Sequence, residues 1–127
     1  MIAAALISAL TVCEPGAVAR TAAEAVDAFM AAYNARDLAA AEAVISPGAR
    51  IGLGAGLQMT GADLIGNYRT HIFLTEPAYV MRPLQQLAVG DTVAQTEAFT
   101  GGPQGTFTGL TVYRVKDGCI VEMSVNT

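Results

Sequence analysis

The last quarter of the chain constrains the fold most, because it predicts two β-strands joined by a tight turn. Residues 107–115 and 119–125 are rich in β-branched and aromatic side chains. Between them lies Lys116-Asp117-Gly118, and Asp-Gly favours a hairpin because glycine adopts the positive φ of such turns. A two-stranded hairpin alone is marginally stable in water. The sequence therefore predicts further strands and a helix packed against one face.

The preceding chain supplies these elements. Strands are predicted over residues 79–89 and 92–100, on either side of Gly90-Asp91, and two shorter ones over residues 50–53 and 57–59. Three helices are predicted ahead of the long strands: one from residue 22 to about 34 or 35, one over residues 38–45, and one from residue 61 that ends at Glu76-Pro77. Thr21 and Glu24 have the spacing of a capping box for the first helix, and Thr60 and Asp63 repeat it for the third. Ser46-Pro47-Gly48 is predicted to end the second helix.

Composition narrows the functional classes. Of the 127 residues, 53% are hydrophobic and 14% are charged, which excludes a disordered chain and predicts extra apolar surface in a pocket or a subunit interface. The net charge is −4 and there is no basic run. Because binding to phosphates requires clustered cations, no nucleic-acid partner is expected.

The N-terminal residues differ from the rest. Residues 2–12 form an apolar run, Glu14-Pro15-Gly16 interrupts it, and Ala17-Val18-Ala19 has the small-x-small form of a signal-peptidase site. We therefore expect residues 1–19 to be a signal peptide, residues 20–127 the domain, and the location periplasmic or secreted. The alternative is a buried N-terminal helix in a cytoplasmic protein. The run is too short for a stable membrane span.

The two cysteines and single histidine limit other chemistry. Cleavage after Ala19 would remove Cys13 and leave Cys119 without an intramolecular partner, as a small buried hydrophobic residue. One histidine and no close cysteine pair are too few ligands for a structural zinc site. No metal and no cofactor are expected.

Three segments resemble a known superfamily: Phe29 to Leu38, Met59-Thr60-Gly61 ahead of a helix, and Val112 to Glu122. They are similar to the nuclear transport factor 2-like superfamily, particularly its SnoaL-like and ketosteroid-isomerase-like branches. The resemblance implies an α+β fold in which a cone-shaped, curved antiparallel sheet wraps around N-terminal helices, an architecture also called cystatin-like. It also implies a cavity at the wide end of the cone and a homodimer through the outer face of the sheet.

The resemblance does not carry over the isomerase residues. The oxyanion tyrosine of ketosteroid isomerases falls on Phe29, the basic aspartate near Leu53, and the second aspartate on Thr111. None of these side chains can act as the acid or base that the isomerisation needs. Ketosteroid isomerase chemistry is therefore not expected.

Other side chains are candidates for the cavity. Strand alternation places Gln95 and Glu97 on one face of their strand, and Thr111 and Tyr113 on one face of the next, but it does not settle which face is concave. The candidate pocket residues are Phe29, Tyr33, Tyr68, Arg82, Gln95, Glu97, Thr111 and Tyr113.

One hypothesis gives these residues catalytic roles: Glu97 as acid or base, His71 as a proton shuttle, and Tyr113 and Tyr68 as donors to an oxyanion. Each has a structural alternative. Glu97 can pair with Arg82 on the solvent face, His71 can be a surface residue, and the tyrosines can be core residues.

The sequence is compatible with two functions of different classes, a binding protein and an enzyme. In the first, an exported domain binds a small apolar molecule in its cone. In the alternative, a SnoaL-like isomerase, cyclase or hydrolase uses acid–base chemistry on a small apolar or polyketide-like substrate. An enclosed cavity containing Glu97 or His71 would favour the enzyme, whereas an interior filled by Phe29, Tyr33, Met59 and Met81 would favour a binding or structural role.

Overall fold

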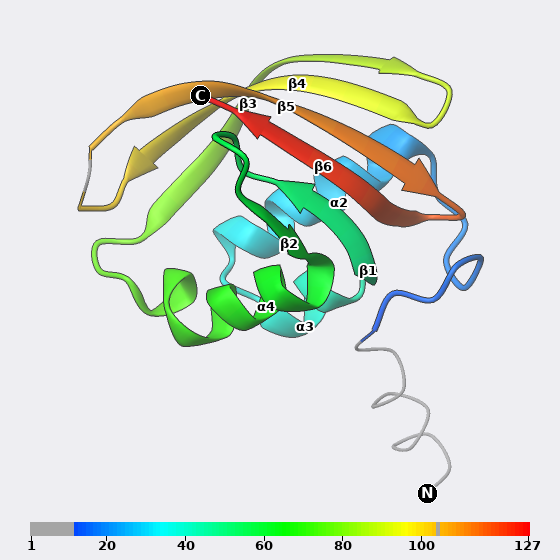
Figure 1. Cartoon of the computed structure of the whole chain (residues 1–127), viewed down its shortest axis with the longest axis horizontal. Coiled ribbons are helices and arrows are strands. Elements are labelled where there is room, and N and C mark those ends of the chain that lie inside the picture. Colours follow the sequence, from blue (N-terminus) through cyan, green and yellow to red (C-terminus); the bar gives the residue numbers. More distant parts are fainter. Residues whose placement is uncertain (1–11, 104) are drawn as a thin grey trace, which may run out of the picture.

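The computed structural model describes residues 12–103 and 105–127 and shows a curved six-stranded sheet with helices on one face (Figure 1). Strand order across the sheet is β2-β1-β6-β5-β4-β3. The strands are β1 Ile45–Gly52, β2 Gln58–Thr60, β3 Tyr79–Val89, β4 Thr92–Gly101, β5 Phe107–Lys116 and β6 Cys119–Asn126. The helices are α2 Ala22–Asn34, α3 Leu38–Glu42, α4 Gly61–Thr70 and the short 3-10 helix η2 Ile72–Leu74. The predicted α+β class with a curved sheet over N-terminal helices is confirmed.

The four long strands form the antiparallel meander that the turn residues predicted. β3 pairs with β4, β4 with β5, and β5 with β6, all antiparallel. One pairing is different, because β1 joins β6 in parallel and carries β2 at the sheet edge. The sheet is therefore mixed. β1, from the first half of the chain, thus pairs with the edge of β6 that the C-terminal hairpin leaves free.

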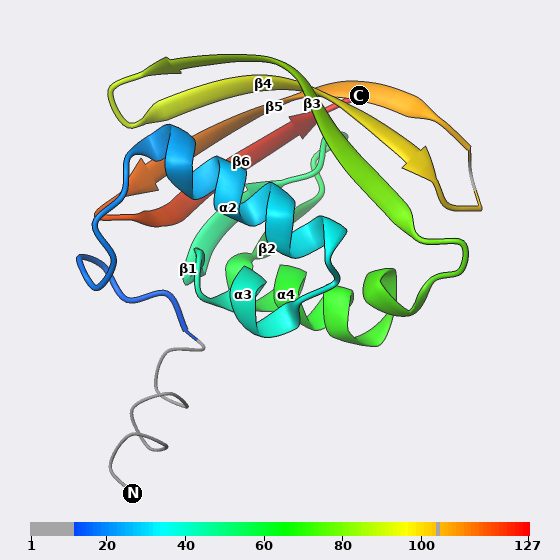
Figure 2. The same ribbon diagram turned by 180° about the vertical axis from the view of Figure 1, so that it is seen from behind.

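The helix α2 lies across the concave face of the sheet (Figure 2). Thr21 and Glu24 form the predicted capping box at its start. At its end, the Asn34 side chain donates to the Met81 carbonyl and accepts from the Met81 amide, both at 2.8 Å. This double hydrogen bond fixes the C-terminal end of α2 against the edge strand β3, so the helix cannot slide along the sheet.

The second helix is shorter than predicted. α3 ends at Glu42, and residues 46–48 belong to β1 instead of terminating a helix. The register of β1 against β6 shifts between Ile45 and Arg50, and β2 pairs with β1 only from Arg50 onward. Pro47 therefore lies where the ladder is interrupted, the position at which a strand tolerates a residue without an amide hydrogen.

The expectation that Cys119 has no intramolecular partner applies to a chain cleaved after Ala19, whereas in the uncleaved chain Cys119 has one. Cys119 forms a disulfide with Cys13, with 6.0 Å between the Cα atoms, although the two are 106 residues apart in sequence. Residues 12–20 run beneath the turn between β5 and β6 (Figure 1). There the Gly16 amide donates to the Asp117 carbonyl at 2.7 Å, and Arg20 donates to the Gly118 carbonyl at 2.9 Å. The pairing depends on this tertiary contact and is invisible in the cysteine spacing.

We call residues 12–20 the N-terminal strap. Arg20 also donates to the Ala43 carbonyl at 3.1 Å, so the strap joins the hairpin to the segment after α3. A side chain at Gly118 would come within 2.5 Å of the Val18 carbonyl oxygen, and Gly118 has a positive φ. The glycine of the predicted turn thus serves the hairpin and the close approach of the strap. Most of the apolar run, residues 1–11, lies outside the described residues.

No helix within residues 12–103 and 105–127 has the length and apolar character needed to cross a membrane.

Candidate functional site

A buried carboxylate lies at the centre of the inner face of the sheet. Glu97 is 1% exposed, and both of its oxygens accept hydrogen bonds. Oε1 accepts from the Thr111 hydroxyl at 2.7 Å, whereas Oε2 accepts from the Gln95 side-chain amide at 2.7 Å and from the Tyr113 hydroxyl. The charge of a buried carboxylate requires such partners, because its transfer from water is otherwise prohibitively costly. We call Glu97, Gln95, Thr111 and Tyr113 the acid cluster.

The sheet register explains why these four side chains meet. Gln95 in β4 is opposite Thr111 in β5, and Glu97 and Tyr113 each lie two residues from one of them, on the same face. The structure thus settles which face is concave: the acid cluster faces the helices. Ala94, Thr96 and Ala98 alternate with these residues on the outer face.

The space between the acid cluster and the helices is filled by aromatic rings. The Phe29 ring centroid lies 6.4 Å from those of Tyr33 and Tyr68 and 6.2 Å from that of Tyr113. Phe73 stacks on Tyr68 at 4.9 Å. Phe29 is 1% exposed. It is therefore a core residue at the position where we expected a cavity wall.

Burial changes the acid–base behaviour of three tyrosines. It raises the pKa of Tyr33 to about 12, with the nearby Tyr79 adding to the rise and Arg36 opposing it. It also raises the pKa of Tyr68 well above the usual value, with smaller contributions from Tyr33 and Glu97. The pKa of Tyr113 also rises for the same reason, and the charge of Glu97 and the hydrogen bond to it add to the effect. All three hydroxyls stay neutral at ordinary pH, and that of Tyr113 donates to Glu97.

A pocket of about 390 Å³ opens beside the aromatic rings, and we call it the mouth pocket. Phe99 and Phe107 stack on its wall with centroids 4.8 Å apart. The mouth pocket is lined by Tyr33, His71, Ile72, Thr75, Tyr79, Phe99, Pro103 and Phe107. Glu97 is not among these residues. Tyr33 connects the two regions, because its ring lines the pocket and packs on Tyr68 at 5.4 Å.

Two predicted site residues lie away from the acid cluster. His71 is an exposed residue after the last turn of α4; it lines the mouth pocket and forms no hydrogen bond with Glu97. Arg82 is exposed and pairs with Ala98 on the outer face, whereas Pro83 is opposite Glu97. The suggested Arg82–Glu97 pair on the solvent face is therefore wrong. The two side chains leave opposite faces of the sheet.

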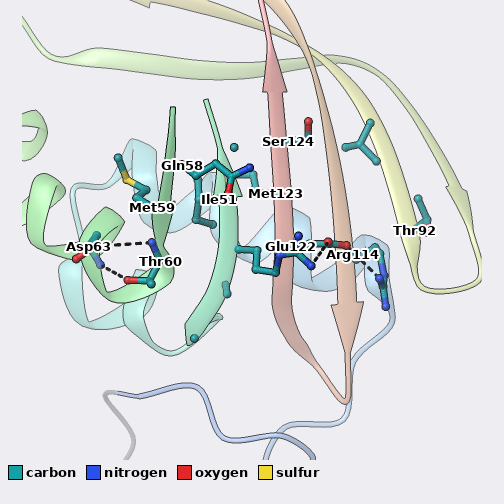
Figure 3. A pocket seen from close by; sticks show the side chains of 15 residues that line it. Ile51, Gln58, Met59, Thr60, Asp63, Thr92, Arg114, Glu122, Met123 and Ser124 are labelled. Atoms are coloured by element: carbon teal, nitrogen blue, oxygen red, sulfur yellow. Dashed lines mark hydrogen bonds and ion pairs between the residues drawn. The ribbon is translucent and has the colours of Figure 1, made fainter. Parts of the chain in front are cut away.

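A second depression lies on the outer face, where β2, β1, β6 and β5 run side by side (Figure 3). It has a volume of about 650 Å³. Its charged side chains are paired with one another, since Arg114 contacts Glu122 at 3.0 Å and Asp91 at 3.9 Å. Thr60 and Asp63 likewise satisfy each other as the capping box of α4. These charged groups of the outer groove are thus already engaged in ion pairs or in a helix cap.

Sequence reasoning missed most of the mouth pocket. Tyr79, Phe99 and Phe107 were not among the candidates, although Phe99 is two residues from Glu97 and so on the same face of β4. That spacing would have identified Phe99 once the concave face was known. Within the described part of the chain, no group of three or more His, Cys, Asp or Glu side chains could hold a metal ion.

Comparisons with known proteins place this geometry in context. A model of the SnoaL-like domain family matches residues 26–123. No curated protein matches the sequence. A cystatin-fold protein of uncharacterised function from Novosphingobium aromaticivorans has 18% identity and a TM-score of 0.75, over 86% of this chain and 100% of that one.

Two further similar structures are named as candidate enzymes. IdmH, a candidate polyketide cyclase from Streptomyces antibioticus, has 22% identity and a TM-score of 0.73, over 84% of this chain and 91% of that one. A candidate ketosteroid isomerase from Kribbella flavida has 17% identity and a TM-score of 0.71, over 82% and 75%. At such identities the likeness shows the fold alone.

The raised tyrosine pKa values predict a loss of stability in alkali. An unfolded tyrosine ionises near pH 10, whereas the fold raises the pKa of Tyr33 to about 12 and the pKa values of Tyr68 and Tyr113 well above the usual value. The stabilising contribution of these tyrosines is complete below about pH 10 and is lost as the pH rises through the folded values. Each tyrosine contributes up to about 1.4 kcal/mol per pH unit in that window.

Spectrophotometric titration of tyrosinate checks this expectation. At pH 11 the folded protein should show fewer ionised tyrosines than the same protein in denaturant. Tyr33→Phe should make the loss of stability with pH less steep above pH 10. Ionisation of all tyrosines near pH 10 in a chain that is still folded by circular dichroism would contradict the assignment.

Proposed function

Because the chain belongs to the SnoaL-like domain family, as the sequence resemblance predicted, we propose that it binds a small apolar molecule with a planar ring at the mouth pocket. The observation that carries the proposal is the concentration of rings there. Tyr33, Tyr79, Phe99 and Phe107 line a space of about 390 Å³, within the range that small-molecule sites occupy. Aromatic walls favour a flat ligand that can stack or meet ring edges.

The polar groups of the mouth pocket are few, which defines the ligand further. His71, Thr75 and the tyrosine hydroxyls can exchange hydrogen bonds with a ligand. Among the described residues that line it, none is a lysine, arginine, aspartate or glutamate. A strongly charged ligand would therefore lose its hydration without gaining a counter-charge. The pocket fits a neutral molecule with one or two polar substituents.

The second candidate function is acid–base catalysis by Glu97 on a small apolar or polyketide-like substrate. The acid cluster favours it, because a buried carboxylate with hydroxyl donors beside it is a common arrangement for proton transfer. Similar folds named as candidate polyketide cyclases are consistent with such a substrate. Tyr33 or Tyr68 would have to move for a substrate to reach Glu97 from the mouth pocket. For this reason binding is the first proposal and catalysis the second.

We propose that the protein is exported to an oxidising compartment and keeps its N-terminal strap. A disulfide persists in such compartments and is rare where thiols are kept reduced, and Cys13 is bonded to Cys119. The strap contains the Ala17-Val18-Ala19 motif, so cleavage after Ala19 would remove Cys13 and the contact between Gly16 and Asp117. Any removal of a leader then occurs ahead of Cys13.

We also propose a homodimer through the outer face of the sheet. This face carries exposed apolar side chains, with Leu87 and Val89 67% and 68% exposed on β3 and Leu110 42% exposed on β5. The adjacent outer groove contains arginines and acids in comparable number. In a two-fold contact each residue meets the same surface of its partner, so apolar side chains bury one another and opposite charges pair. A second copy of the chain is therefore a suitable partner.

Ligand binding can be tested with 1-naphthol, a neutral two-ring probe. We expect saturable binding with shifts of the NMR signals of the mouth-pocket residues. Phe107→Ala should weaken binding about tenfold, equivalent to about 1.4 kcal/mol, because one wall of the pocket is lost. Leu87→Ala, an exposed apolar residue on the outer face, is the matched control and should bind normally. Equal weakening by both variants, or no saturation in wild type, would contradict the proposal.

Export and retention of the strap can be tested by intact mass after expression of the full chain in a bacterial host. The product in the periplasm or medium should contain Cys13 and gain two hydrogens on reduction. Reduction, or Cys13→Ser, should lower the free energy of unfolding by about 2–5 kcal/mol, and reductant should have no further effect on Cys13→Ser. A mature chain that begins at Arg20, or a product confined to the cytoplasm, would rule the proposal out.

Dimerisation can be tested by sedimentation at micromolar concentration. Wild type should sediment as a dimer, and Leu87→Arg as a monomer, because the new charges would face each other across an apolar contact. Leu74→Arg is the control, since Leu74 is 69% exposed on η2, away from the sheet. The proposal fails if wild type is a monomer or if both variants dissociate.

A further inference from the structure

A chain of side-chain hydrogen bonds leads from the protein surface to the buried Glu97. The side-chain amide nitrogen of Gln86 donates to Asp27 Oδ1 at 3.2 Å and to Gln95 Oε1 at 2.9 Å. The side-chain amide nitrogen of Gln95 then donates to Glu97 Oε2 at 2.7 Å. Asp27 and Gln86 are exposed, whereas Gln95 and Glu97 are almost fully buried. We call these four residues the amide chain.

An irregularity in β3 creates this arrangement. The register of β3 against β4 shifts between Pro83 and Gln85, so that Gln85 pairs with Thr96 on the outer face and Gln86 with Gln95 on the inner face. On that face Gln86 reaches Asp27 of α2. This register shift, a bulge in β3, therefore determines which glutamine faces inward and joins the amide chain, because bulges in strands commonly redirect side chains.

The amide chain has only one consistent direction. A glutamine side chain donates through its nitrogen and accepts through its oxygen, and an ionised carboxylate accepts only. Asp27 at the surface requires a donor from Gln86, which turns the Gln86 nitrogen inward toward Gln95 as well. Gln95 must then accept with its oxygen and present its nitrogen to Glu97. If the Gln95 side-chain amide were turned over, its nitrogen would face the Gln86 nitrogen and its oxygen would face Glu97 Oε2. The second contact would be favourable only if Glu97 carried a proton.

We propose that Gln95 and Gln86 are positioning residues that hold Glu97 as an ionised hydrogen-bond acceptor. Hydroxyls can donate or accept, so Thr111 and Tyr113 alone would tolerate either protonation state. Gln95 favours the ionised form, because Gln86 fixes it as a donor to Oε2 and a donor stabilises a charged carboxylate more than the neutral acid. Tyr68 and Tyr113 are the titratable groups nearest Glu97, and no described arginine or lysine forms an ion pair with it. The ionised state thus depends on neutral donors.

This inference assigns a direction to proton transfer. An acceptor-only carboxylate takes a proton from a substrate, while the electron pair of the broken bond stays on the substrate. Glu97 is thereby the base, and not the acid, of the second proposed function. The catalytic meaning of the inference rests on that proposed function, but the ionisation of Glu97 does not.

Infrared spectroscopy of the whole protein tests the inference without any ligand. The carbonyl band of a protonated carboxylic acid is followed against pH, and its loss in Glu97→Gln assigns it. Wild type should show no such band from Glu97 at neutral pH. Gln95→Met removes the fixed donor, so the acid band should appear with its midpoint at a higher pH than in wild type, because one hydrogen bond to the charged form is lost.

Two more variants make the test specific. Gln86→Met leaves Gln95 in place but frees its orientation, so a smaller rise in the same direction is expected. Because Gln86 is exposed, this variant keeps the test available if Gln95→Met does not fold. Gln85→Met, on the outer face of the same strand, is the matched control and should leave the midpoint unchanged.

Some results would overturn the inference. A protonated Glu97 in wild type at neutral pH would do so, as would equal midpoints in the Gln86→Met and Gln85→Met variants. Failure of 1-naphthol to bind, or absence of catalysis, would count against the proposed functions and leave the infrared result standing.

Discussion

The burial of one carboxylate is the constraint on which the inner face of the sheet depends. Glu97 requires donors from Gln95, Thr111 and Tyr113, and a hydrogen bond to a charged group contributes about 1.5–3 kcal/mol. These donors face inward only in one register of β4 against β5. A slip of one residue would turn Thr111 and Tyr113 to the outer face and leave the buried carboxyl group without these partners. The acid cluster and the pairing of the long strands therefore support each other.

The aromatic rings explain why the acid is covered and where the space for a ligand remains. Phe29 packs between Tyr33, Tyr68 and Tyr113, so α2 lies on the acid cluster through side chains and leaves little room for solvent. The double hydrogen bond from Asn34 to Met81 holds the helix in that position. The filling ends at Tyr33, beyond which the mouth pocket begins. Ligand access and carboxylate burial are thus set by the same layer of rings.

The inner face also shows how one fold carries different side chains. Ketosteroid isomerase residues are missing from the three positions where the resemblance would place them, and Phe29 and Thr111 are parts of the core and the acid cluster. The buried carboxyl group of this chain lies on β4. Family membership therefore fixes the cone, and the side chains on its inner face decide what it does.

The sequence by itself determined the four long strands, the two capping boxes and the order of elements, because each depends on neighbours a few residues apart. It also placed Gln95 with Glu97, and Thr111 with Tyr113, on common faces through the alternation of side chains along a strand. It could not choose the concave face, since Ala94, Thr96 and Ala98 are small residues that fit either side. Tertiary structure made that choice by bringing α2 against one face. The Cys13–Cys119 disulfide, the parallel pairing of β1 with β6, and the amide chain through Asp27 also join residues distant in sequence, whose meeting depends on how the whole chain packs.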